Sequence, residues 1–353
     1  MRNMETKVRI VNGDGPDTDY QEAAEILKRG GLVAFPTETV YGLGGNALDE
    51  DAAKKIYAAK GRPSDNPLIV HIAGMEALDE LTSNVTEHAK KLAERFWPGP
   101  LTMILPKSEK VPLGTTGGLQ TVAIRMPNHP VALRLIRQSG LYLAAPSANT
   151  SGRPSPTLAE HVAEDLTGKI EMILDGGMVD VGIESTIVDL TEDIPVILRP
   201  GCISKAMLEE VVGTVTIDPA VNGPKKDTSF KPKAPGMKYK HYAPKADMTI
   251  ISGEREKVVE TIRLRAESAT LKGRKVGILA TDETVGLYTE GTVVSIGTRK
   301  EEGSIARGLY KILRDFDHLK VDEIYAESFE DDTMGAAIMN RLCKAAGYAV
   351  EHV

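Results

Sequence analysis

The sequence has little cysteine, few aromatic residues and no long apolar run. Its 353 residues include two cysteines and one tryptophan, and aromatic residues make up 5% of the chain. Cys202 and Cys343 are far apart and lack metal-ligand spacing, so we expect neither a disulfide framework nor a zinc site. No stretch approaches the ~18 apolar residues of a membrane-spanning helix, and the first residues hold no apolar signal core. We therefore expect a cytoplasmic protein.

The chain also lacks an excess of positive charge and several familiar catalytic signatures. Its formal net charge of −7 argues against binding nucleic acid through overall charge. The phosphate-loop pattern GxxxxGK[ST] is absent, and no Ser-His-Asp order, reactive cysteine or metal-ligand cluster can be assembled. An enzyme with this sequence would act by positioning its substrates and stabilising charge, not through a covalent intermediate.

An α/β pattern fills the first two thirds of the chain. Short apolar or β-branched runs, such as "LVAFPT", "PLIVHI" and "TVAIRMP", alternate with segments of helical periodicity. In "DEDAAKKIYAAKG", Asp49 is a suitable N-cap and Gly61 a suitable C-cap, which predicts a helix between them. Adjacent strand-like runs near residues 185–199 predict some antiparallel pairing. We expect a twisted, mixed sheet over residues 1–217.

A change in composition marks a linker after this domain. Residues 222–245 contain seven lysines, four prolines and one aspartate and show no periodicity. We therefore assign residues 218–245 to a basic, extended linker. The βαβ pattern then resumes with "MTIISG" and "KVGILAT". It predicts a smaller, Rossmann-like domain with a parallel sheet over residues 246–353.

Two cations in a proline-stiffened loop are the first candidates for chemistry. In "KGRPSDNPLIVHI", Lys60 ends a predicted helix and Arg62 follows just beyond it. A cation near a helix C-terminus often only complements the helix dipole, which would explain Lys60 but not Arg62. A guanidinium beside an ammonium suits a phosphate chain, so we favour phosphate binding over a solvated charged surface. We expect both side chains to face a crevice rather than the core.

Polar residues at the ends of other strands predict the rest of a site. Arg125 lies inside the apolar run "TVAIRMP", where it needs either an acidic partner or a carboxylate ligand, and the sequence does not choose between them. His71 lies in the run "PLIVHI", where a lone histidine is more often a core residue. Hydroxyls and a further arginine flank several strands and predict a ligand-binding crevice: Thr37, Ser147, Ser155, Ser185 and Arg199.

Six motifs together resemble the YrdC-like family: "FPTETVYGLG", "KGRPSDNPLIVHI", "AIRMPNHP", "APSANTSGRPSPT", "ESTIVDL" and "LRPG". The linker motif "APGMKYKHYAP", followed by a second α/β domain, is similar to the two-domain members, the threonylcarbamoyl-AMP synthases. The resemblance covers essentially the whole chain. It implies a nucleotidyltransferase that converts L-threonine, bicarbonate and ATP into threonylcarbamoyladenylate and pyrophosphate, with Mg²⁺ accompanying ATP.

The resemblance also implies roles for individual residues. Contacts to threonine would come from Thr37, His71, Arg125, Ala145 and Ser185. Contacts to ATP would come from Lys60, Arg62, Ser64, Thr121, Ser147, Ser155, Arg199 and Tyr239. Lys60 and Arg62 would be the catalytic cations. This implied role for His71 replaces its interpretation as a core residue, and the implied role for Arg125 favours a carboxylate ligand.

The implied product would pass to a partner transferase that modifies tRNA next to the anticodon. We expect the linker to close over the nucleotide as a lid. The alternative from another class is a protein that binds tRNA or double-stranded RNA through the lysine-rich linker, without adenylate synthesis. The net charge and the lack of aromatic stacking motifs weaken this alternative. The carbamoyl-adenylate chemistry of hydrogenase maturation uses a related domain, but the zinc-finger cysteines of that family are absent here.

Overall fold

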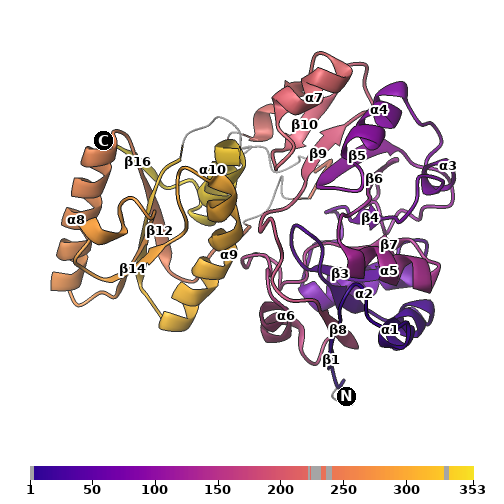
Figure 1. Cartoon of the computed structure of the whole chain (residues 1–353), viewed down its shortest axis with the longest axis horizontal. Helices are drawn as coiled ribbons and strands as arrows, with labels where there is room; N and C mark the ends of the chain where they lie inside the picture. The colour runs from indigo at the N-terminus through magenta and orange to yellow at the C-terminus, as the bar shows by residue number, and fades with distance from the viewer. Residues whose placement is uncertain (1–3, 222, 224–231, 236–240, 330–333) are drawn as a thin grey trace. The chain divides into compact units, whose positions relative to one another are not determined.

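The computed structural model describes residues 4–221, 223, 232–235, 241–329 and 334–353. The chain forms two compact units, drawn in Figure 1. The first consists of Met1–Ser151, Ser155–Asp180 and Glu184–Lys238, and the second of Gly152–Pro154, Val181–Ile183 and Tyr239–Val353. The limits predicted from the sequence, at residues 217 and 245, stay predictions.

In the described part of the first unit, eleven strands form one mixed sheet. The pair β4 and β6 and the pair β5 and β9 are parallel, whereas β9 and β10 are antiparallel. The predicted antiparallel pairing near residues 185–199 is thereby confirmed. The order across the sheet is β1 (Lys7–Ile10), β8 (Met172–Asp175), β2 (Val33–Phe35), β3 (Gly42–Asn46), β7 (Leu143–Ala144), β4 (Ile69–His71), β6 (Thr121–Arg125), β5 (Leu101–Pro106), β9 (Thr186–Asp189), β10 (Val196–Arg199) and β11 (Thr216–Ile217).

Helices cover this sheet and connect its strands. The predicted caps of α2 (Glu50–Lys60) are confirmed: the side chain of Asp49 accepts from the amide of Asp51, and Gly61 takes the left-handed conformation with φ 61°. This helix therefore stops at the residue before the turn that carries Arg62. The other helices are α1 (Thr18–Lys28), α3 (Ala77–Leu81), α4 (Glu87–Phe96), α5 (Pro130–Ser139), α6 (Ala159–Leu166), α7 (Lys205–Val212) and the 3₁₀ turn η1 (Pro219–Val221).

Alternation along the short strands buries both faces of the sheet. In β4, Val70 joins the largest apolar cluster, and its neighbour Ile69 joins a separate cluster. Ala234 belongs to that second cluster and is completely buried. The neighbouring Lys233 forms an ion pair of 3.2 Å with Asp189 in β9. A described part of the predicted linker therefore packs against strands of the first unit.

The second unit contains a parallel sheet, as the sequence predicted. Its described strands lie in the order β14 (Thr292–Ser295), β13 (Val276–Ala280), β15 (Glu323–Glu327), β12 (Asp247–Ser252) and β16 (Val350–His352), and all pairs are parallel. Helix α8 (Arg255–Leu271) packs against Val276 and Ile278. Phe316 of α9 (Glu302–Leu319) lies against Gly277, on the opposite face, with α10 (Met334–Ala345) beside α9 (Figure 1). A 3₁₀ turn, η2 (Val285–Leu287), follows β13.

Candidate functional site

Sheet topology gathers several predicted residues at one edge of the first unit. His71 and Arg125 end the parallel strands β4 and β6 and are direct partners in the register. Strand β9 is parallel to β5, which is antiparallel to β6, so the start of β9 lies near the end of β6. Ser185 stands just before β9, and Arg199 ends the antiparallel neighbour β10. Four residues that are far apart in the sequence are therefore neighbours.

Arg125 forms a buried ion pair with Glu38. Its Nη2 lies 2.7 Å from Oε1 of Glu38, and the two side chains are only 4% and 7% exposed. Its Nη1 donates to the hydroxyl of Thr39 at 2.8 Å, and its Nε donates to the carbonyl of Gly99 at 3.3 Å. Nη2 and both carboxylate oxygens nevertheless lack a well-directed hydrogen bond within the described chain. Glu38 is therefore an acidic partner of the kind that the sequence predicted as one possibility. Atoms of both side chains can still form hydrogen bonds with a ligand.

His71 is uncharged at neutral pH. Burial, assisted by the nearby charge of Arg125, lowers its pKa to about 3. Its Nδ1 lies 3.2 Å from the carbonyl of Ile69, and since a carbonyl can only accept, this nitrogen carries the proton. The ring stands edge-on to Phe35 at 6.3 Å between centroids. His71 therefore contributes a neutral polar group to the site.

Ser185 links Arg199 to the strand beside it. Arg199 donates from Nη2 to the Ser185 hydroxyl at 3.1 Å and from Nε to the Ser185 carbonyl at 3.0 Å. The same hydroxyl lies 2.8 Å from the hydroxyl of Thr102 in β5. All three side chains are buried. A fixed guanidinium and two hydroxyls therefore stand together at the start of β9.

Lys60 joins the end of α2 to the loop after β7. Its ammonium group donates to the carbonyl of Asn149 at 2.6 Å and to that of Ser147, and its own carbonyl accepts from the amide of Ser151. Arg62 holds its own turn instead, because its guanidinium donates to the carbonyls of Asn66 and Pro67. The expectation that both side chains face a crevice is not confirmed: Lys60 and Arg62 are only 1% and 9% exposed, since both cations are bound to loop carbonyls.

The remaining predicted residues are less closely joined. Thr37 is buried, and its hydroxyl lies 2.9 Å from that of Thr39, which ties it to Arg125. Ser155 donates to Glu184 at 2.6 Å. Ala145 is buried beside β4, and its amide donates to Ile69. Ser64 is exposed and Thr121 half-buried at the start of β6. Tyr239 lies outside the described residues.

The contacts predicted from the sequence did not include four polar neighbours of these residues. Three of them lie within a quoted motif, where the signal was a polar side chain next to a predicted contact, whereas Thr102 lies in none. Their partners are remote in the sequence, and no spacing rule connects them. The four are Glu38, Thr39, Thr102 and Glu184.

The described residues set limits on the chemistry of the site. No group of three or more histidine, cysteine, aspartate or glutamate side chains in this part of the chain could hold a metal ion. None of the described helices is long and apolar enough to cross a membrane. Cys202 and Cys343 form no disulfide.

Two family models match successive parts of the chain. Residues 25–201 match the Sua5, YciO and YrdC model, described as telomere recombination. Residues 203–347 match the model described as threonylcarbamoyl-AMP synthase, C-terminal domain. The resemblance inferred from six motifs and the linker is thereby confirmed across both units.

Individual relatives match over nearly the whole chain. The threonylcarbamoyl-AMP synthase of Bacillus subtilis is 54% identical over 332 residues, covering 94% of both proteins. That of Pyrococcus abyssi is 54% identical over 328 residues, covering 93% of this chain and 94% of its own. The crystal structure of P. abyssi Sua5 complexed with L-threonine superposes with a TM-score of 0.94 at 50% identity, covering 99% of this chain and 100% of that one. The chain therefore belongs to the threonylcarbamoyl-AMP synthase family.

Proposed function

We propose that this chain makes L-threonylcarbamoyladenylate from L-threonine, bicarbonate and ATP and releases pyrophosphate. The observation that supports this most is the pair of buried arginine sites at one edge of the sheet. Arg125 stands beside Glu38 and Thr39, and Arg199 stands beside Ser185. The first site suits the two opposite charges of an amino acid, and the second suits a phosphate group.

The amino acid would bind at the Arg125–Glu38 pair. Its carboxylate would meet the guanidinium, and its ammonium group, one carbon away, would meet the carboxylate of Glu38. Glu38 would take the ammonium proton. The free amine would then attack bicarbonate with loss of water, or add to carbon dioxide with loss of a second proton from nitrogen, and so form a carbamate. In this proposal Arg125 and Glu38 pair with each other until the amino acid binds. Each of them then pairs with the group of opposite charge on the amino acid.

The threonine side chain would be recognised by hydrogen bonds. His71 is neutral, so it offers one nitrogen lone pair to a hydroxyl without adding charge. The hydroxyl of Ser185 stands beside the same strand ends and is held by Arg199. Thr37 and Ala145 would complete the pocket. A site that hydrogen-bonds a hydroxyl discriminates strongly against an analogue that lacks it.

Phosphoryl transfer would then use the cations. A carbamate oxygen would attack the α-phosphorus while the bond to the β-phosphate breaks, and pyrophosphate would leave in line. Negative charge builds on the phosphate oxygens, where Lys60, Arg62 and Arg199 would stabilise it. Further ATP contacts are proposed for Ser64, Thr121, Ser147, Ser155 and Tyr239. Mg²⁺ would arrive with ATP as part of the substrate, held mainly by phosphate oxygens and water.

The linker would close over the nucleotide as a lid. Ala234 is buried against Ile69 and Ala123, which lie in the strands that end at His71 and Arg125. It is also buried against Ile187, which lies in the strand that begins just after Ser185. Residues 232–235, the described part of this stretch, therefore lie against the sheet beside the proposed site. A lid would exclude water from an adenylate that hydrolyses readily.

The product would pass to a tRNA threonylcarbamoyl transferase, which would modify the adenosine next to the anticodon. We propose that this contact is transient. A cytoplasmic location would suit that role, and it is supported by two widely spaced cysteines that form no disulfide.

The direct test is product analysis. Purified protein is incubated with ATP, L-threonine and ¹³C-bicarbonate, and the products are identified by mass spectrometry. We expect an adenylate that carries the ¹³C atom, formed together with pyrophosphate. ADP and phosphate without an adenylate would contradict the proposal.

A further inference from the structure

A pocket in the second unit lies where parallel sheets bind ligands. From β13 the chain runs outward to β14, whereas from β15 it crosses β12 to reach β16 in the opposite direction. This change of direction is a topological switch point, and ligands of open α/β sheets bind at the carboxyl ends of the strands beside it. A pocket of about 410 Å³ lies at this end of the sheet, and its lining includes Ser252, Glu254, Arg255, Arg299, Glu327 and Ser328.

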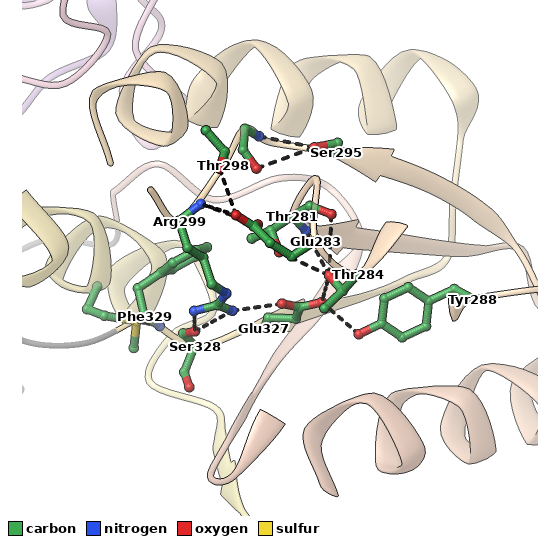
Figure 2. A network of polar contacts seen from close by, with 12 residues as sticks. Thr281, Glu283, Thr284, Tyr288, Ser295, Thr298, Arg299, Glu327, Ser328 and Phe329 are labelled. Atoms are coloured by element: carbon green, nitrogen blue, oxygen red, sulfur yellow. Dashed lines mark hydrogen bonds and ion pairs between the residues drawn. The ribbon is translucent and has the colours of Figure 1, made fainter. Parts of the chain in front are cut away.

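Arg299 is fixed in this pocket from both sides, as Figure 2 shows. Its backbone amide donates to Oε1 of Glu283 at 3.0 Å. Hydrogen bonds to Glu283, led by that from the Thr298 hydroxyl, lower the pKa of Glu283 to about 2 and keep it charged. The guanidinium lies 4.8 Å from the centre of the Phe329 ring and donates twice to the carbonyl of Ser328. The arginine is therefore held in place before any ligand arrives.

Glu327 is buried next to Arg299, and both of its carboxylate oxygens accept hydrogen bonds within the protein. It is 1% exposed, and its Oε2 accepts from Nη2 of Arg299 at 2.7 Å. Its Oε1 accepts from the hydroxyl of Tyr288 at 2.7 Å and from that of Thr284 (Figure 2). Burial next to this carboxylate raises the pKa of Tyr288, so the tyrosine remains a donor. Glu327 is neutralised inside the protein and does not present a negative charge to the pocket.

The lining keeps an excess of hydrogen-bond donors. Nε of Arg299 is buried without a hydrogen-bond partner among the described residues. Three further groups of the lining form no hydrogen bond or ion pair with the described residues. They are the hydroxyls of Ser252 and Ser328 and the guanidinium of Arg255. Arg255 also begins the 17-residue helix α8, whose N-cap residue, Glu254, makes no capping bond. Glu254 is the remaining carboxylate of the lining, and it pairs with Lys257 at 3.3 Å.

We propose that this pocket binds the phosphate group of a small molecule. Arginine, hydroxyls and a helix N-terminus are the donors that proteins combine for phosphate oxygens, and here all three stand around one pocket. Its volume lies at the lower end of the range for small-ligand sites, ~300–1,000 Å³, which is enough for pyrophosphate or a mononucleotide. The lining of this pocket shares no residue with the proposed reaction site, so each site can be altered without changing the residues of the other.

Hydrogen–deuterium exchange of the full-length protein tests this site. The probes are inorganic phosphate, pyrophosphate and AMP, each added alone at millimolar concentration. We expect slower exchange of the amides in residues 252–258 and 327–329 with at least one probe. Protection by all three would identify the phosphate group itself as the ligand, whereas protection by pyrophosphate alone would identify the product of the proposed reaction.

Two substitutions that leave the buried ion pair intact show whether the lining is responsible. Arg255→Ser and Ser328→Ala should each weaken the protection, Arg255→Ser by about tenfold or more in probe concentration, since it removes a charged donor. Lys272→Ser is the matched control, because it removes the same charge at the far end of α8. A Lys60→Ala variant should lose adenylate synthesis and keep this protection.

Three outcomes would overturn the proposal. They are protection confined to the first unit, an equal loss of protection in Lys272→Ser and Arg255→Ser, and protection by tRNA but by none of the three small probes.

Discussion

The Nη2 atom of Arg125 lies 2.7 Å from the Oε1 atom of Glu38, and both side chains are almost completely buried. Removing two charges from water costs several kcal/mol each, and their attraction offsets this only when the geometry is good. Here Nη2 and both carboxylate oxygens lack a well-directed hydrogen bond within the described chain. The pair is therefore expected to serve ligand binding more than stability.

A double substitution separates these two roles. Arg125→Met alone should lower the free energy of unfolding by about 3–5 kcal/mol, because Glu38 is left as a buried charge without its partner. Glu38→Met combined with Arg125→Met should recover most of that loss. Neither variant should bind threonine. Urea unfolding and threonine calorimetry measure the two properties, and normal threonine binding by the double variant would rule out the assigned site.

Lys60 should be required for both the loop and the reaction. Lys60→Met keeps the length of the side chain but removes its hydrogen bonds to the carbonyls of Ser147 and Asn149. We expect a loss of about 1–3 kcal/mol in stability and a fall of ~10²-fold in threonine-dependent pyrophosphate release.

The control for Lys60 is Lys54→Met on the same helix, where the lysine is exposed and pairs with Asp51. This variant should stay within about 0.5 kcal/mol of the parent protein and keep its activity. Near-normal turnover in Lys60→Met would show that this cation has no part in the reaction.

Stability should decrease as the pH falls below neutrality. His71 titrates at about 3 in the folded chain instead of the ordinary 6.5, and burial lowers the pKa of His129 as well. Between pH 6.5 and a pH of about 3, His71 carries a proton in the unfolded chain and none in the folded chain. The free energy of unfolding should therefore fall with decreasing pH, by up to ~1.4 kcal/mol per pH unit for each such histidine.

Urea unfolding at about pH 7.5 and pH 5.5 checks this prediction against a His71→Asn variant. The variant should show a smaller difference between the two pH values than the parent protein. An equal difference in both proteins would mean that His71 does not couple stability to pH.

The linker should become protected when the substrates bind. We expect ATP and threonine together to slow proteolysis at the lysines of residues 218–245. Ala234→Glu should abolish that protection and increase hydrolysis of the adenylate, because it places a charge where Ala234 is completely buried. Tyr239→Ala should show a milder defect of the same kind.

Lys233→Ala is the comparison, since it removes only a partly exposed ion pair with Asp189. It should behave much like the parent protein. Unchanged cleavage with and without substrates, together with normal adenylate accumulation in Ala234→Glu, would remove the support for a lid.

Much of the fold could be predicted because its signals are local. Asp49 and Gly61 mark the ends of α2, and the strands of the second unit follow the βαβ pattern. Strand β16 was missed, since its three residues are partly exposed and carry no alternation that stands out. Helix α7 was also missed, although Ser204 caps it with a side-chain bond to Met207.

The site could be predicted in part. An arginine inside an apolar run showed that Arg125 needs a partner, but only the folded sheet shows that Glu38 supplies it. The same holds for Ser185, whose two partners come from different strands. Lys60 and Arg62 were identified as cations of interest, yet their burial depends on loop carbonyls that no periodicity reveals.

Pyrophosphate release measured with each amino acid in turn tests the central claim most directly. With ATP and bicarbonate present, threonine should be turned over fastest. Serine should be a poor but detectable substrate, since a missing methyl costs only ~1–3 kcal/mol, whereas valine should be rejected by about 10⁴-fold because it leaves the hydroxyl-binding groups unpaired. Omitting bicarbonate should abolish the signal. Equal turnover of valine and threonine, or pyrophosphate release that needs no bicarbonate, would contradict the account.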